Sequence, residues 1–467
     1  MNYMENEPQG NAWKTLIAVS IGVFVVNVDY WSVSVALPEM AKEFDVTTIA
    51  LDWVLSAYII SFCASVAVAG RLGDLFGRKK LLLLGIALFG AFSLLVGLSD
   101  SVGMIVAARI ALGLGGGLIF ALATAILSNA CSVSELTKML GLLTGMGALG
   151  GAIGPVLGGL VTETIGWQWI FYLNVPVTII AYLAVKWGTV ESYDTEHRGR
   201  IDYLGVLLLV VSITGLALFI AKITEWGILS STSIWMAAIT ILFFCLFVTR
   251  ENKCKNPLVD LKLFEHRTFA GFILSGALSK MYLAIIIFTT MILLEKVLSY
   301  DPLKAGLFFL AISGTVSISS VFLSAVTKAI GDKSTMLLSL VLQITGAIIL
   351  LNYSDPIWIL IGLAVAGPGC SWGFSTAMVG SITTLPRNLV GLASSASLTI
   401  IIMSAGIGVT IAGTVIDTFA GEGYRTTGIN ASIITAILAA AIAFLIALIV
   451  IPKRTPARKS FTQQGTS

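Results

Sequence analysis

Residues 70–80 read Gly70-Arg71-Leu72-Gly73-Asp74-Leu75-Phe76-Gly77-Arg78-Lys79-Lys80. The glycines permit a tight turn because they lack a Cβ atom, and Asp74 can bond Arg78 or the N-terminus of a neighbouring helix. Apolar runs at about 51–70 and 81–99 stand on either side of this charged loop. The pattern predicts two membrane-spanning helices joined by a short basic loop.

The composition extends this prediction to the whole chain. Of 467 residues, 57% are hydrophobic and 11% are charged, whereas a soluble domain carries about 25% charged residues. These values predict a polytopic membrane protein and argue against a soluble enzyme. The net charge of +3 is small, and the basic residues are scattered among loops, so no nucleic-acid partner is expected.

Fourteen apolar stretches are long enough to cross a bilayer core of about 30 Å as α helices. The weakest is the eighth, because its apolar part is short. The stretches are 16–38, 51–70, 81–99, 102–128, 139–162, 168–187, 203–221, 233–249, 269–294, 304–327, 335–352, 357–380, 390–416 and 431–451.

The distribution of lysine and arginine orients these spans. With the N-terminus inside, most basic loop residues fall on the cytoplasmic side, as the positive-inside rule requires. The basic residues left outside are Lys42, Lys222, Lys296, Lys304 and Arg425. The sequence therefore predicts cytoplasmic termini in a cell membrane. The polar, acidic start through Lys14 does not resemble a signal peptide.

Two charged loops, at about 188–202 and 250–268, divide the spans into six, two and six. The predicted fold is all-α, with a six-helix bundle at 1–187 and a second bundle with a cytoplasmic tail at 269–467. An inserted helix pair with its flanking loops occupies 188–268. Transporters are commonly built from such repeats, with the substrate near the midplane between them.

The loop at 70–80 resembles the loop signature of the major facilitator superfamily. The fifth span resembles the antiporter motif of that family through Gly145, Gly150, Gly151, Gly154, Pro155, Gly158 and Gly159. Small residues four apart allow close helix packing, and an internal proline lets a helix bend. The resemblance implies an exporter or antiporter, although close packing alone would also account for the glycines.

Further motifs resemble the fourteen-span drug:proton antiporter branch of this family. They include 29–38, 166–176, 201–205, 257–264 and 299–306. The sequence departs from the pattern of that branch at Trp31, Ser34, Leu112, Gln168 and Glu295. These departures leave the substrate range open more than the fold.

Three ionisable side chains lie within predicted spans, where a charge is costly and is a functional candidate. Burial favours the neutral form of the Asp29 carboxyl, so Asp29 can exchange a proton, and the resemblance implies the same role. The alternative is a buried ion pair of fixed charge. Arg109 matches the fourth-span motif whose arginine is linked to proton transfer, yet arginine keeps its proton. Arg109 would therefore act on a neighbouring carboxylate or bond backbone carbonyls, possibilities that include a purely structural tether.

Lys280 lies about halfway along the ninth span. The resemblance implies that the first and ninth spans line one cavity, which predicts that Asp29 and Lys280 face each other. Lys280 would then hold Asp29 ionised or bind an anionic substrate group; the alternative is a lysine that snorkels along its helix. Near these charges, Tyr30, Trp31 and Tyr282 are candidates for the wall of a substrate site.

No metal or cofactor is expected. The five cysteines show no CxxC spacing and the two histidines, His197 and His266, are far apart. No phosphate-binding GxxxxGK[ST] loop is present for ATP, which favours the proton gradient as the driving force.

The sequence thus predicts a monomeric, proton-coupled antiporter that exports small organic molecules by alternating access, with protons, substrate and the lipid bilayer as its partners. The first alternative is an exporter of an endogenous anionic metabolite, such as a carboxylate siderophore, with Lys280 as counter-ion. The second is a membrane sensor that transports nothing, or a membrane-bound enzyme.

Overall fold

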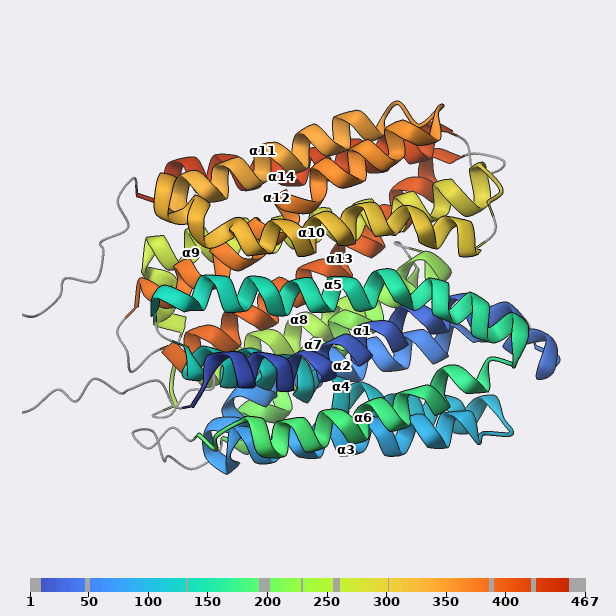
Figure 1. The fold of residues 1–467 in the computed structure, drawn as a ribbon, viewed down its shortest axis with the longest axis horizontal. Helices are drawn as coiled ribbons and strands as arrows, with labels where there is room; N and C mark the ends of the chain where they lie inside the picture. Colours follow the sequence, from blue (N-terminus) through green and yellow to red (C-terminus); the bar gives the residue numbers. More distant parts are fainter. Residues whose placement is uncertain are drawn as a thin grey trace, which may run out of the picture.

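The computed structural model describes residues 10–46, 51–131, 133–192, 202–227, 230–254, 261–300, 302–385, 390–420 and 426–452. Within these ranges every regular element is helical, and the long helices run roughly side by side (Figure 1). The helices are α1 (Ala12–Glu43), α2 (Asp52–Phe76), α3 (Arg78–Gly97), α4 (Val102–Ala130), α5 (Val133–Thr164), α6 (Gln168–Gly188), α7 (Tyr203–Trp226), α8 (Ser231–Glu251), α9 (Arg267–Ile292), α10 (Pro302–Ile330), α11 (Asp332–Leu350), α12 (Pro356–Thr383), α13 (Val390–Ala420) and α14 (Thr426–Val450).

Each predicted stretch corresponds to one of these fourteen helices. Eleven of them are long and apolar enough to cross a membrane. The other three, α2, α7 and α13, contain shorter apolar runs within the described residues, Trp53–Val66, Leu204–Leu216 and Ile407–Ile416. The chain is therefore a multi-pass membrane protein, and a count of fourteen spans agrees with these lengths.

Polar side chains set the starts of several helices. Asn11 accepts the N–H groups of Trp13 and Lys14 at 3.0 and 3.1 Å before α1. Asp355 does the same for Ile357 before α12, at 2.9 Å, and is followed by Pro356 in the first turn. These residues satisfy N–H groups that have no partner inside the helix, which is why the helices begin there.

The helices pack in two groups. In the N-terminal half, α1 packs on α4, α5 and α6, α2 on α4, and α3 on α4 and α6; in the C-terminal half, α9 packs on α12, α13 and α14, α10 on α12, and α11 on α12 and α14. The two halves meet along α5 and α10, which run side by side in Figure 1, and along α2 and α13. The boundaries 1–187, 188–268 and 269–467 stay a prediction.

The inserted helices α7 and α8 differ in their surroundings. Helix α7 packs on α8 and also touches α2 and α13, one helix from each half. Helix α8, the weakest predicted span, forms a full helix of 21 residues. Only 11% of its apolar window is buried, so its surface is available to lipid.

In each half, a lysine near the start of the third helix bonds backbone carbonyls at the end of the last helix, a contact that we call a lysine clasp. Gly77 has φ +103° and Gly331 has φ +82°, conformations that glycine adopts without strain. Two residues after Gly77, Lys79 Nζ donates to the carbonyls of Lys186 and Thr189 at the end of α6, both at 2.7 Å. Two residues after Gly331, Lys333 Nζ donates to Leu448 and Ile451 at the end of α14, at 2.7 and 2.5 Å. A cation at a helix C-terminus is favourable, so each clasp ties the third helix of a half to its last.

Candidate functional site

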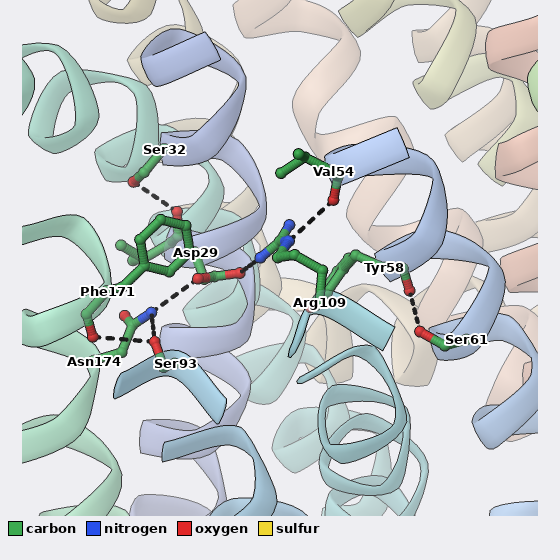
Figure 2. A network of polar contacts seen from close by, with 10 residues as sticks. Asp29, Ser32, Val54, Tyr58, Ser61, Ser93, Arg109, Phe171 and Asn174 are labelled. Carbon is green, nitrogen blue, oxygen red and sulfur yellow. Dashed lines mark hydrogen bonds and ion pairs between the residues drawn. The ribbon is translucent and has the colours of Figure 1, made fainter. Parts of the chain in front are cut away.

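Asp29 lies in the middle of α1 and is enclosed by other helices. Its Oδ2 accepts a hydrogen bond from Arg109 Nη1 of α4 at 2.6 Å, and its Oδ1 accepts one from Asn174 Nδ2 of α6 at 2.9 Å (Figure 2). The side chains of Asp29 and Arg109 are both 0% exposed. Because charge-assisted hydrogen bonds are strong, this buried pair fixes the positions of α1, α4 and α6 relative to one another.

Arg109 extends the network to α2. Its Nε donates to the backbone carbonyl of Val54 at 3.1 Å. Its guanidinium carbon lies 4.3 Å from the ring centroid of Tyr58 and 6.0 Å from that of Phe171, within the range of cation–π attraction. In the described part of the chain Arg109 Nη2 meets no hydrogen-bond partner. Arg109 thus contacts both a carboxylate and a backbone carbonyl, the two kinds of partner that its chemistry predicts.

Asn174 and Ser93 complete the network, and the sequence analysis did not select either of them. Asn174 Nδ2 also donates to Ser93 Oγ of α3 at 3.0 Å, and Ser93 Oγ donates to the carbonyl of Phe171 at 3.0 Å (Figure 2). Asn174 stands in the motif at 166–176 but carries no charge. An amide in an otherwise apolar span is the signal that would have found it, because such a group needs a partner inside the protein.

Glycines of α5 allow α1 to come close. A Cβ atom at Gly154 would lie 2.9 Å from the carbonyl oxygen of Val28, and one at Gly158 would lie 2.7 Å from that of Ser32. Ser32 Oγ donates to the Gly154 carbonyl at 2.7 Å. At Gly159 a Cβ atom would find its nearest neighbour, in Val35, at 3.8 Å. A Cβ atom at Gly150, another motif glycine, would lie 2.5 Å from the carbonyl oxygen of Phe24. Gly150, Gly154 and Gly158 therefore position the Asp29 helix, and Gly159 does not.

Pro155, between these glycines, lies inside α5. It points to the other half, since a Cβ atom at Gly306 of α10 would lie 3.4 Å from Pro155 Cβ. The motif therefore contributes to packing within the N-terminal half and to the contact between halves.

The loop at 70–80 forms the turn that the sequence predicts. Helix α2 ends at Phe76, Gly77 makes the turn, and α3 begins at the buried Arg78. Gly70 is buried, and a Cβ atom at Gly73 would lie 2.6 Å from Leu122 Cδ2 of α4. The side chain of Asp74 lies outside the described residues, so its bond to Arg78 stays a prediction.

Lys280 does not pair with Asp29 in this structure. Its Nζ lies 5.5 Å from the ring centroid of Phe374 on α12. Both oxygens of Asp29 are instead bonded within the N-terminal half. The expectation that these two charges face each other is therefore wrong for this state, because Arg109 and Asn174 lie on helices that pack directly on α1. Among the described residues no carboxylate forms an ion pair with Lys280.

The three aromatic candidates have different environments. The rings of Tyr30 and Trp31 meet edge to face at 5.2 Å, and both side chains are half-buried. Tyr30 also stacks on Tyr58 at 6.0 Å. Tyr282 is 0% exposed and donates its hydroxyl to the carbonyl of Gln343 at 2.6 Å. Tyr282 thus packs inside the C-terminal half in this state and forms no open wall.

A multi-pass helical membrane protein whose helices pack in two groups, with an enclosed carboxylate–arginine pair, has the arrangement of a membrane transporter. The chain is a member of the Major Facilitator Superfamily, whose family model matches residues 19–251. The sequence interpretation of the family is therefore confirmed, and with it the helical fold. The relatives described below bear the names of drug-resistance and export proteins.

Several drug-resistance and export proteins are similar to the chain. The multidrug resistance protein Stp of Mycobacterium tuberculosis is 30% identical over 81% of this chain and 71% of its own length. The tetracenomycin C resistance and export protein of Streptomyces glaucescens is 25% identical, over 89% and 78%. Multidrug resistance protein 3 of Bacillus subtilis is 26% identical, over 86% and 78%.

The crystal structure of the human organic anion transporter MFSD10 has the same fold. It superposes with a TM-score of 0.67, covers 94% of this chain and 100% of its own, and is 13% identical. At that identity the likeness concerns the fold alone. The comparisons and the helices together make the chain a membrane transporter of this superfamily.

Proposed function

We propose that this chain is a proton-coupled antiporter that exports small organic molecules across the cell membrane by alternating access. The observation that carries the proposal is the enclosed carboxylate of Asp29, bonded by Arg109 at 2.6 Å in the middle of a spanning helix. A buried ionisable group within a membrane costs free energy, so its presence indicates a function, here a role in transport. The drug-resistance and export names of the relatives support the same conclusion.

The geometry suggests how a proton acts on the protein. Ionised Asp29 holds α1 to α4 and α6 through Arg109 and Asn174. Protonation removes the negative charge on which the strong bond from Arg109 depends. The free energy of the Arg109–Asp29 bond differs between the ionised and the protonated state of Asp29. The proton acts here as a ligand, and it shifts the equilibrium between conformations by the difference in its binding free energy to each of them. Proton uptake at Asp29 would thereby loosen the bond between α1 and α4.

The substrate would lie between the two halves, near Tyr30 and Trp31, whose rings are half-buried. The fold suggests two bundles, 1–187 and 269–467, that rock against each other while the pair at 188–268 stays at their side. The glycines of the loop at 70–80 and of α5 would serve that movement. We further propose that the protein works as a monomer with both termini in the cytoplasm.

One observation favours a second cargo. Lys280 places an amine within a spanning helix, and no carboxylate pairs with it in the described residues. A cation without a counter-ion would bind an anionic group well, so an anionic metabolite such as a carboxylate siderophore is the alternative substrate.

Reconstitution into liposomes tests proton coupling. With a fluorescent drug as cargo, an imposed pH gradient should drive accumulation by the wild-type protein. The Asp29→Asn variant keeps the shape of the side chain without its charge, and it should lose gradient-driven accumulation while still binding the drug. Accumulation at the wild-type level in this variant would show that Asp29 is not the coupling group.

A further inference from the structure

The Asp29 carboxylate is surrounded by donors. Arg109 Nη1 lies 2.6 Å from Oδ2, and Asn174 Nδ2 lies 2.9 Å from Oδ1. A guanidinium has N–H donors and no acceptor, and an amide nitrogen is also a donor only. This arrangement fits the ionised carboxylate. A protonated Asp29 would direct its O–H at a group that cannot accept it.

Of the two residues bonded to Asp29, only Asn174 also carries an acceptor, its amide oxygen. No hydrogen bond reaches that oxygen from the described part of the chain. Asn174 lines a crevice between α1, α5 and α6, whose walls are mainly apolar, with Val28, Leu157 and Leu173 among them. A half-turn of the amide exchanges its oxygen and nitrogen without any movement of the backbone.

Ser93 permits this exchange. Its Oγ now accepts from Asn174 Nδ2 at 3.0 Å and donates to the Phe171 carbonyl at 3.0 Å. A hydroxyl both donates and accepts, so Ser93 can turn its proton to the amide oxygen once Asn174 has turned. The Phe171 carbonyl keeps a partner, since it lies within α6 and accepts the N–H of the next turn.

We infer that Asn174 is a positioning residue that responds to the protonation of Asp29: it presents its amide nitrogen to the carboxylate and its amide oxygen to the carboxylic acid. The inference rests on the proposed proton coupling, which supplies the proton that comes to rest on Asp29 Oδ1. Other titratable groups around the carboxylate are Arg109 of α4, Tyr58 and Cys63 of α2 and Tyr30 of α1. In the described residues, α6 and α3 contribute the uncharged side chains of Asn174 and Ser93 to this network.

Infrared difference spectroscopy of the full chain in lipid, recorded as the pH is lowered, tests the inference. The C=O band of protonated Asp29 is identified as the band that disappears in Asp29→Asn. An acid that donates a hydrogen bond absorbs at lower wavenumber than a free acid. We therefore expect the band to move to higher wavenumber in Asn174→Leu. Gradient-driven transport should fall on the order of tenfold, as the loss of one buried hydrogen bond implies.

A matched pair of variants keeps the test valid if Asn174→Leu does not fold. Asn174→Thr and Asn174→Val have nearly the same shape, but only threonine has a hydroxyl that can donate or accept. The threonine variant should keep the band near its wild-type position, and the valine variant should show the free-acid band. An identical band in both variants would overturn the role of Asn174 and leave proton coupling intact. The absence of any Asp29 band in the wild-type protein would instead refute proton coupling itself.

Discussion

The Asp29–Arg109 pair is the residue contact with the largest expected effect on stability. Removing one member of a buried ion pair leaves an uncompensated charge and costs about 3–5 kcal/mol. Arg109→Met should therefore lower the thermal stability of the detergent-solubilised protein strongly. The double variant Asp29→Leu with Arg109→Met should recover most of the loss, because no buried charge remains. A single variant as stable as the wild type would mean that the pair is hydrated or loosely bound.

Lys280 separates the two proposed cargoes. Lys280→Ala in everted membrane vesicles should leave efflux of a cationic dye unchanged or improved, since a repelling charge is removed. Efflux of an anionic cargo should decrease on the order of tenfold or more if the ammonium binds it, as loss of a charged hydrogen bond implies. Lys280→Arg keeps the charge and is the matched control. Loss of cationic transport in Lys280→Ala with retention in Lys280→Arg would point to a structural role.

At this scale the sequence predicts the charged residues but not their partners. Asp29, Arg109 and Lys280 are visible because charges are rare in apolar spans. Which cation meets Asp29 depends on the rotation and packing of α1, and those follow from the glycine contacts at 154 and 158. The sequence predicts Tyr282 in the wall of a substrate site, but its hydroxyl donates to a backbone carbonyl of α11. No sequence pattern identifies that partner.

The α5 glycines offer a prediction at the scale of the helix pair. Alanine at Gly158 would bring a Cβ atom to 2.7 Å from the Ser32 carbonyl, a backbone atom of α1. The helices must move apart, at a cost of about 1–3 kcal/mol for overpacking, so Gly158→Ala should lower both the melting temperature and transport. Gly159→Ala is the control, because its nearest neighbour would be at 3.8 Å. Equal effects of the two variants would contradict close α1–α5 packing.

An ion pair joins Asp202, which directly precedes α7, to Arg250 in the last turn of α8. Arg250 Nε donates to Asp202 Oδ2 at 3.0 Å. Burial raises the pKa of the Asp202 carboxyl, but hydrogen bonds from Arg250 and from the Gly205 N–H outweigh burial and hold the pKa below its usual value. A lowered pKa in the folded state means that the stabilisation is complete above about pH 4, the pKa of an unfolded aspartate, and is lost as the pH falls further.

Asp202→Asn should therefore be less stable than the wild type at pH 7, with the difference shrinking as the pH falls below about 4. Thermal unfolding of the two proteins across that pH range measures it. The effect should be small, because Arg250 is 45% exposed and water screens the pair. A difference that persists unchanged at low pH would indicate that the amide disturbs the start of α7 for another reason.

The sequence predicts each of the fourteen long helices α1 to α14 but places several ends wrongly. The sequence predicts that the first span ends at Pro38, whereas α1 continues through Pro38 to Glu43. Proline removes one hydrogen bond but does not forbid a helix whose next turn is stabilised by burial. Met40 is 0% and Ala41 9% exposed beyond it. Apolar length therefore locates spans better than single breaking residues do.

For the whole molecule, the seam between α5 and α10 predicts a cross-link between the halves. A Cβ atom at Gly145 would lie 3.6 Å from Ser317 Cβ, within the range of about 3.5–4.5 Å that a disulfide needs. In a background without other cysteines, Gly145→Cys with Ser317→Cys should form a disulfide in membranes. If alternating access separates this seam, oxidation should abolish transport and a reductant should restore it.

Each single cysteine variant should be insensitive to oxidation, which makes them the controls. Failure of the double variant to cross-link would mean that the halves do not meet at this seam in the membrane. The sequence does not predict this contact, since small residues on α5 permit a close neighbour without specifying which helix it is.

The seclusion of Asp29 also bears on the speed of the protein. A side chain with 0% exposure cannot collect a proton from water until the helices around it separate. Proton transfer between a carboxyl and water is fast once they meet, whereas collective helix motions take microseconds to milliseconds or longer. Helix motion, and not proton transfer, should therefore limit the rate of turnover. Replacing water by deuterium oxide should slow export little, whereas membrane stiffness and temperature should change the export rate strongly.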